Sequence, residues 1–266
     1  MRQPSCLARL FTTAAVATIL AVGLAGCKTA GMSDVTGSIG GKTERALEAD
    51  PARAADALGE KFRSNPRDAD VALRYGQALR ASGQRTQAVA VFEQATLLSP
   101  GNKALLAGYG RALADTGSFQ RAFEVLTSAH TPANPDWRIL SVQGAVLDQM
   151  GRHDEARRYY ASALKIRPDE PSVLSNLGLS YMLSKDLPKA ESTLRQAYSG
   201  GGGDPRVRQN LGLVVGLQGR FGEAETIVKA DLPPEEAAAN VAYLKQMLSS
   251  KSQQLGAQSE DTRGRS

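Results

Sequence analysis

The sequence predicts an all-α protein built as a solenoid of repeated helix pairs, and three observations carry this prediction. Five glycines recur at a constant interval of 34 (110−76), at Gly76, Gly110, Gly144, Gly178 and Gly212. Alanines keep the same interval at Ala88, Ala122, Ala156, Ala190 and Ala224. With 42% apolar but only 5% aromatic residues, the composition suits helices that pack through small side chains. Because glycine inside a helix costs about 1 kcal/mol relative to alanine, close packing must offset this cost in every repeat.

The order of small, large and proline positions within each unit resembles the tetratricopeptide repeat, a helix-turn-helix unit with the same period. The first unit carries Tyr75, Gly76, Gly83, Ala88, Phe92, Ala95 and Pro100. Four further units follow the pattern, and two departures stand out: Lys185 replaces a turn glycine and Asp231 replaces a small residue. The resemblance implies a right-handed superhelix in which the first helix of each unit lines a concave surface.

This register divides the chain into five repeats and two caps. The repeats are expected at residues 69–102, 103–136, 137–170, 171–204 and 205–233. Residues 46–68 form an N-terminal capping helix, because Ala54, Leu58 and Pro66 continue the register backwards. Pro233 and Pro234 close the last repeat and start a C-terminal capping helix at residues 234–249. The polar tail at residues 250–266 has little to bury, and we expect it to be disordered.

Residues 1–26 resemble a bacterial lipoprotein signal peptide that ends at the lipobox Leu24-Ala25-Gly26-Cys27. The resemblance implies that Cys27 carries a covalent lipid. We expect residues 27–45 to form a flexible tether between the lipid and the repeats. In enterobacterial lipoproteins, an aspartate directly after the lipidated cysteine favours retention in the inner membrane. Because Lys28 stands at that position here, we expect a protein anchored at the periplasmic face of the outer membrane. The alternative is an uncleaved membrane-spanning anchor, for which the uncharged stretch is short and weakly apolar. The only other cysteine, Cys6, lies in the segment that would be removed, so the mature chain would hold no disulfide.

No pattern in the sequence predicts catalysis, a metal site or nucleic-acid binding. His130 and His153 are the only histidines and have no cysteine or second histidine at ligand spacing. The segment Gly40 to Thr43 looks like the end of a phosphate-binding loop, but Thr36 stands where that loop needs glycine. Loss of Arg2 and Arg9 would leave a mild net charge of +3 (30−27), without a basic run. We therefore expect a non-enzymatic protein with no cofactor apart from the lipid on Cys27, no metal, no nucleic-acid partner and no small-molecule substrate.

The resemblance also indicates which side chains face the concave surface, and the two halves of that surface differ. In repeats four and five they form an apolar strip with two asparagines one period apart, whose amides can bond the backbone of an extended peptide. We predict a partner groove there, made of Asn176, Leu179, Met182, Leu183, Arg206, Gln209, Asn210, Leu213 and Leu217. An alternative is that some of these leucines are buried against neighbouring helices. Repeats one to three offer a secondary polar surface with Arg74, Arg80, Arg111 and Arg138.

The fifth repeat, Gln209 to Phe221, and the segment Ala230 to Glu235 that follows it resemble the TadD group of Tad (Flp) pilus assembly lipoproteins. The resemblance implies an interaction scaffold in the bacterial cell envelope, used in assembly or secretion of a type IVb-like pilus. Its partners would be protein or peptide components of that machine, and the lipid would hold it to the membrane. The alternatives are a pilotin-like lipoprotein for another secretin or type IV pilus and an accessory factor of a cell-wall enzyme.

Overall fold

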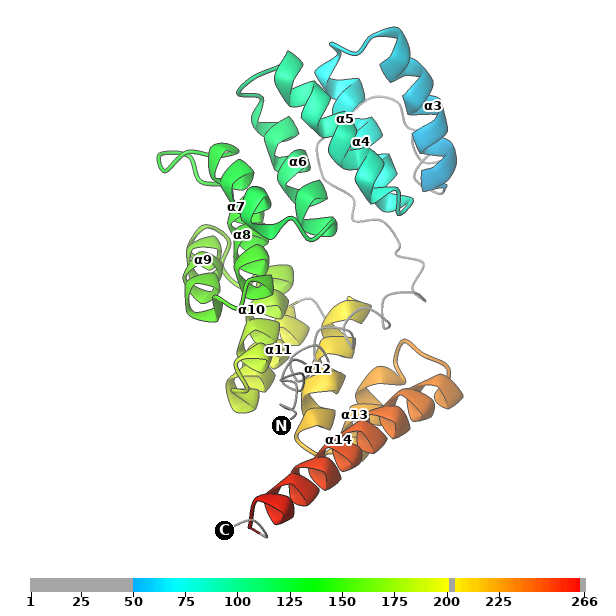
Figure 1. Cartoon of the computed structure of the whole chain (residues 1–266), viewed down its shortest axis with the longest axis vertical. Coiled ribbons are helices and arrows are strands. Elements are labelled where there is room, and N and C mark those ends of the chain that lie inside the picture. Colours follow the sequence, from blue (N-terminus) through cyan, green and yellow to red (C-terminus); the bar gives the residue numbers. More distant parts are fainter. Residues whose placement is uncertain (1–49, 201–203, 264–266) are drawn as a thin grey trace, which may run out of the picture. The chain divides into compact units, whose positions relative to one another are not determined.

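The computed structural model describes residues 50–200 and 204–263, with side chains described up to residue 250. The chain divides into two units, residues 1–49 and 50–266, and the description below concerns the second. The predicted signal peptide, Cys27 and the tether lie outside the described residues, as does the start of the predicted N-terminal cap. All regular elements within the described part are helices (Figure 1).

The helices follow the predicted register. The first helices of the five repeats begin at the same interval of 34 (103−69), at α4 (Ala69–Ala81), α6 (Lys103–Asp115), α8 (Trp137–Gln149), α10 (Pro171–Leu183) and α12 (Pro205–Leu217). The second helices are α5 (Arg85–Leu98), α7 (Phe119–Ser128), α9 (His153–Ile166), α11 (Leu187–Gly200) and α13 (Phe221–Val228). Helix α3 (Pro51–Ser64) lies one period before α5, as the predicted cap requires. Successive helices pack in pairs, and each first helix also contacts the first helix of the next repeat.

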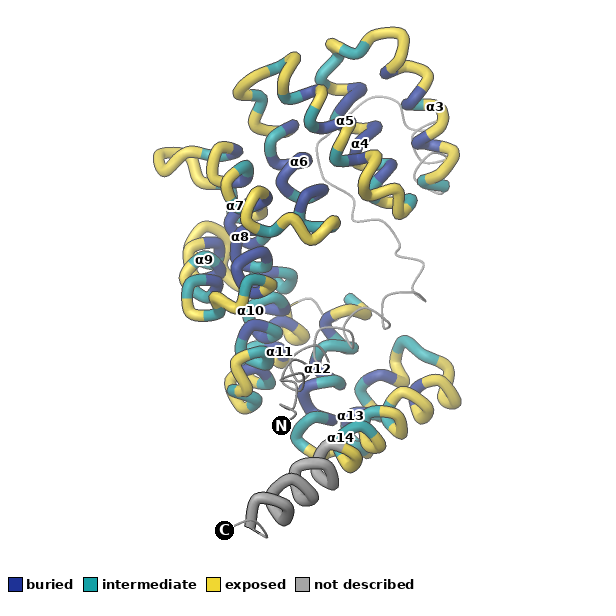
Figure 2. Tube along the Cα trace, viewed as in Figure 1, coloured by how far each residue is buried: buried dark blue, intermediate teal, exposed yellow. Residues whose placement is uncertain are grey.

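The glycine ladder is explained by helix contact within each repeat. A Cβ atom on Gly76 would lie 2.4 Å from the Phe92 ring, and one on Gly178 would lie 2.6 Å from Cγ of Leu194. The other three ladder glycines meet Leu126, Tyr160 and Val228 in the same way. Each glycine therefore lets one large residue of the second helix reach the first helix. Figure 2 shows the resulting buried positions on the faces that neighbouring helices share.

A second set of glycines recurs in the turn between the two helices of a repeat. Gly83, Gly117, Gly151 and Gly219 have φ values between 75° and 83°, a conformation that glycine adopts without steric cost. Lys185 occupies the equivalent turn with φ of 65°. Lys185 thus keeps the turn conformation of the other repeats but adopts a backbone conformation that is strained for a residue other than glycine.

Asp231, the second departure, forms an ion pair with Arg208 of α12. Both side chains are largely buried, with exposed fractions of 9% for Asp231 and 13% for Arg208. The segment after the short helix α13 is therefore held to α12 by a charged contact rather than by a small residue.

The predicted end of the C-terminal cap is wrong. Helix α14 runs from Pro234 to Arg263, so residues 250–263 are helical and not the disordered segment that we expected. The segment contains no proline, and its three Gln and single Lys, Leu, Ala, Glu and Arg residues favour helix, although its three Ser residues and Gly256 do not. Extending an existing helix adds one hydrogen bond for each residue that is ordered, whereas starting a helix is costly. Residues 250–263 therefore continue a helix that the capping residues before them have already started.

Candidate functional site

The predicted partner groove lies on two neighbouring helices, α10 and α12, which contact each other. Of its nine residues only Arg206 is exposed, and the other eight are half-buried. Half-burial is expected for side chains that line a solvent-facing helix surface and also touch the next helix. The structure thus brings the predicted residues onto one pair of adjacent helices.

The two asparagines make equivalent hydrogen bonds to the preceding repeat. Asn176 Nδ2 donates to Ser141 Oγ over 3.1 Å, and Asn210 Nδ2 donates to Ser175 Oγ over 2.9 Å. The two serines are also one period apart, and both are 6% exposed. Each asparagine keeps its carbonyl oxygen and a second N–H group for another partner. The amides are therefore oriented before any ligand binds.

The apolar residues of the groove are of two kinds. Met182 packs against the core cluster that contains Leu194 and Leu211, so part of its surface stabilises the fold. Leu179, Leu183, Leu213 and Leu217 are half-buried on α10 and α12. Arg206 forms an ion pair with Asp204, with Nη2 3.0 Å from Oδ2, at the start of α12.

Helix α14 (Pro234–Arg263) packs against α12, one of the two groove helices. It contacts α12 and α13, and a Cβ atom on Gly216 would lie 2.5 Å from Cδ2 of Leu244. Gly216 therefore admits α14 close to the C-terminal part of α12. Sequence reasoning missed this contact, although the glycine inside a predicted helix was a usable signal.

The secondary arginines lie on α4, α6 and α8, the first helices of three successive repeats. Arg80 forms an ion pair with Asp115 of α6 at 2.6 Å. The Arg138 guanidinium lies 4.6 Å from the ring centroid of Trp137. Arg74 is exposed, and Arg111 is half-buried. At least Arg80 thus has a structural role in joining two repeats.

A buried polar cluster around Asp148 was not predicted. Its carboxylate, only 6% exposed, accepts hydrogen bonds from Tyr160 and Ser180 over 2.9 and 2.8 Å, and it lies 2.8 Å from His153 Nδ1. Burial is the main cause that raises the pKa of Tyr160. The repeat pattern predicts Asp148 on the concave surface and His153 as a lone surface histidine. The packing of α8 on α9 within repeat three, together with Ser180 from α10 of the next repeat, brings these residues together.

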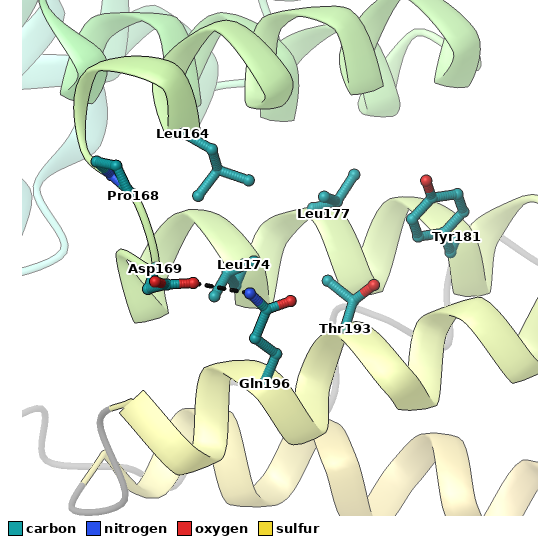
Figure 3. Close-up of a pocket in the computed structure, with 8 residues that line it drawn as sticks. All are labelled: Leu164, Pro168, Asp169, Leu174, Leu177, Tyr181, Thr193 and Gln196. Atoms are coloured by element: carbon teal, nitrogen blue, oxygen red, sulfur yellow. Dashed lines mark hydrogen bonds between the residues drawn. The ribbon is translucent and has the colours of Figure 1, made fainter.

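A separate pocket of about 290 Å³ lies between α9, α10 and α11 (Figure 3). Its apolar lining includes Leu164, Leu174 and Leu177, and its polar lining includes Asp169, Thr193 and Gln196. None of these residues belongs to the predicted groove, although α10 contributes to both.

Two other kinds of site have no counterpart in the described part of the chain. No group of three or more His, Cys, Asp or Glu side chains there could hold a metal ion. None of the helices described has both the length and the apolar character needed to cross a membrane.

Comparison with known proteins confirms the repeats. Residues 76–136 and 148–211 each match a family model described as tetratricopeptide repeat. Together with the all-helical architecture, these matches define the fold as a tetratricopeptide-repeat solenoid. Such repeats serve in general as scaffolds for protein–protein interaction, and neither matched model is that of an enzyme family.

Individual relatives share the repeats over part of their length. BBSome complex member BBS4 from Bos taurus is 25% identical over 162 residues, which cover 61% of this chain and 31% of that protein. The cytochrome c-type biogenesis protein CycH from Bradyrhizobium diazoefficiens is 29% identical over 119 residues, 43% of this chain and 32% of that protein. The chain thus spans about a third of the length of these two curated relatives.

Among solved structures, PilW, a type IV pilus biogenesis factor, matches with a TM-score of 0.65 and 18% identity over 75% of this chain and 94% of PilW. At that identity the likeness shows the fold alone.

Proposed function

We propose that this protein is a non-enzymatic scaffold of the bacterial envelope that binds a peptide segment of a pilus assembly machine in the groove on α10 and α12. The observation that carries the proposal is the pair of equivalent asparagines, Asn176 and Asn210, each oriented by a serine of the preceding repeat. Two oriented amides one repeat apart can bond a peptide backbone at two places, while the leucines beside them contact its side chains.

Within this proposal, the machine is a Tad (Flp) pilus and the protein is held to the outer membrane by a lipid on Cys27. The lipobox before Cys27 and the resemblance of repeat five and the Pro233-Pro234 segment to the TadD group support this finer assignment. The likeness in fold to PilW is compatible with it. Finding no pilus ATPase, secretin or prepilin gene beside the gene for this chain would contradict the assignment.

The groove is tested by variants that change its surface without opening the core. We expect the double variant Asn176→Ala with Asn210→Ala, and separately Leu213→Glu, to fold and to abolish both piliation and cross-linking to machine components. Leu97→Glu is the matched control, because Leu97 is 76% exposed on α5 and lies outside the groove. Met182→Glu is expected to cost more stability than Leu213→Glu, since Met182 packs on the core.

Thermal melts followed by circular dichroism separate the outcomes. If the double asparagine variant and Leu213→Glu fold and still support piliation and cross-linking, the groove is not the partner site. If Leu213→Glu unfolds the protein, Leu213 is part of the core and the groove is misplaced.

The lipid anchor needs its own test. Labelling with a fatty acid should mark the wild-type protein, and Cys27→Ser should remove the label and leave an unprocessed precursor. A wild-type protein that takes up no label would contradict the lipoprotein assignment while leaving the groove untouched.

A further inference from the structure

The pocket between α9, α10 and α11 has a composition that the repeat pattern does not require. At the two preceding junctions, equivalent positions are joined by polar side chains: Tyr109 donates to Glu93 over 3.1 Å, and Gln143 donates to Thr127 over 3.1 Å. One period later (143+34 and 127+34) the pair is Leu177 and Ala161, which cannot form such a bond. The bridge found at those two junctions is therefore absent here, and a pocket with an apolar floor lies between α9, α10 and α11.

Asp169 is held at one end of this pocket in an unusual conformation. Its φ is 57°, at a position two periods after Gly101 (169−101), which has φ of 79°. A carboxylate therefore replaces a glycine at a left-handed position, which aspartate tolerates better than most residues. Asp169 Oδ1 accepts a hydrogen bond from Gln196 Nε2 over 2.7 Å, and this bond joins the loop to α11 (Figure 3).

The polar groups at this end of the pocket offer mainly acceptors. Because Gln196 uses its amide nitrogen on Asp169, its carbonyl oxygen and the second oxygen of Asp169 can still accept. Further along α11 towards Tyr181 (Figure 3), Thr193 donates its only hydroxyl proton to the carbonyl of Lys189 over 2.8 Å, so its oxygen can act only as an acceptor. The neighbouring Arg167 lies 3.8 Å from Glu170 rather than on Asp169.

The other end of the pocket is already occupied by cations. Arg157 and Lys189 lie 5.2 and 5.7 Å from the ring centroid of Tyr181, and they form ion pairs with Asp154 and Asp186 respectively. At the Tyr181 end a positive group of a ligand therefore finds the nearby carboxylates of Asp154 and Asp186 already paired. It is attracted to the Asp169 end, where oxygens of Asp169 and Gln196 adjoin the leucine floor.

We infer that this pocket binds a lysine or arginine side chain presented by a partner protein. The aliphatic stem would lie on Leu164, Leu174 and Leu177, as long basic side chains do on apolar surfaces, and the cationic head would donate to Asp169 and Gln196. The pocket shares no residue with the groove on α10 and α12. It therefore gives the scaffold a second contact point that is selective for charge, and this contact does not depend on the function proposed above.

The inference is tested with blocked tripeptides added to the full-length, isotope-labelled protein. Gly-Lys-Gly and Gly-Arg-Gly should shift the backbone amide signals of Leu177, Thr193 and Gln196, whereas Gly-norleucine-Gly, which keeps the stem without the charge, should not. Asp169→Asn, which preserves shape and tolerates the left-handed conformation, should weaken binding about tenfold, because a hydrogen bond to a charged group is lost. Thr193→Val, which lies further from Asp169 along α11, should change binding little.

The matched control is Asp154→Asn, because Asp154 is a carboxylate on α9 that pairs with Arg157 at the other end of the pocket. It should leave binding of Gly-Lys-Gly and Gly-Arg-Gly unchanged. The inference is overturned if neither basic peptide shifts these signals, if the norleucine peptide shifts them equally, or if folded Asp169→Asn binds as tightly as the wild type.

Discussion

At the scale of single residues, the ladder glycines allow the effect of helix packing on stability to be distinguished from the effect of helix propensity. Gly178 and Gly222 both lie inside helices, but a Cβ atom on Gly178 would meet Leu194 at 2.6 Å and the Ala190 carbonyl oxygen at 3.3 Å, whereas one on Gly222 would meet nothing within 4 Å. The same substitution should therefore destabilise the protein at Gly178 but not at Gly222.

We expect Gly178→Leu to lower the free energy of unfolding by about 1–3 kcal/mol, because overpacking forces α10 and α11 apart. Gly222→Leu should leave stability unchanged or raise it by up to about 0.8 kcal/mol through helix propensity. Circular-dichroism melts of both variants measure the difference. Equal destabilisation by the two substitutions would mean that the ladder is not a packing device.

Lys185 is a second residue whose local conformation makes a prediction. Its φ of 65° occurs where the other repeats use glycine. A left-handed conformation costs a non-glycine residue about 1–2 kcal/mol, part of which is offset because glycine gains freedom in the unfolded chain.

Lys185→Gly should therefore raise the free energy of unfolding by about 0.5–1 kcal/mol. Lys185→Ala removes the same charge and side chain but keeps the strained φ, so it should give no such gain. Denaturant titrations of the two variants would decide between strain and charge as the cause, and an equal gain from alanine would rule out strain.

At the scale of helices, the contact between α11 and the turn before α13 depends on a charged cluster. The carboxylate of Glu191 is 15% exposed, accepts from Gln218 Nε2 over 2.8 Å, and forms ion pairs with Arg195 and Arg220. The hydrogen bond from Arg220 is the largest cause that lowers the pKa of Glu191 from 4.5 to about 2. The junction between repeats four and five is therefore sensitive to acid.

Because the pKa of Glu191 is lower in the folded than in the unfolded chain, its contribution to stability is complete above about pH 4.5 and is lost as the pH falls towards 2. Glu191→Gln should lower the melting temperature at pH 7, and the gap to the wild type should narrow as the pH falls through this range. Glu236→Gln, on the exposed surface of α14, is the control. A gap that stays constant with pH would show that the charge of Glu191 does not stabilise this junction.

At the scale of the whole described unit, stability comes from stacking, so an open end must be covered. Ala237 is fully buried, Val241 packs on the cluster that contains Val214 and Val215, and Leu244 packs at Gly216. All three capping residues precede residue 250. The first half of α14 therefore forms the cap.

Removing residues 251–266 should leave the melting temperature nearly unchanged, whereas removing residues 234–266 should lower it strongly and cause aggregation, because the apolar surface of α12 and α13 becomes exposed. Melts and light scattering of the two truncated proteins measure this. A large loss of stability from the shorter truncation would place the cap in the second half of α14.

The fold could be predicted from the sequence to within a few residues because each repeat contacts mainly its neighbours. The period is then visible as Gly76, Gly110 and their successors, and the helix starts follow from it. The end of α14 could not be predicted in this way, since Ser249 to Arg263 carries no repeat pattern. The expectation of disorder there rested on the lack of apolar residues and neglected helix propensity.

The sequence by itself determined the number of repeats, the caps and the helices that carry the groove residues, since these follow from a periodic pattern in a one-dimensional stack. Only the tertiary structure decided how those residues are used. Asn176 is oriented by Ser141 of the preceding repeat, Met182 is shared with the core, and Asp148 is buried with His153, Tyr160 and Ser180. The pocket beside Asp169 likewise depends on side chains from three helices. Such contacts depend on side-chain shape and on the distance between packed helices, and a pattern of residue types along one chain does not specify either quantity.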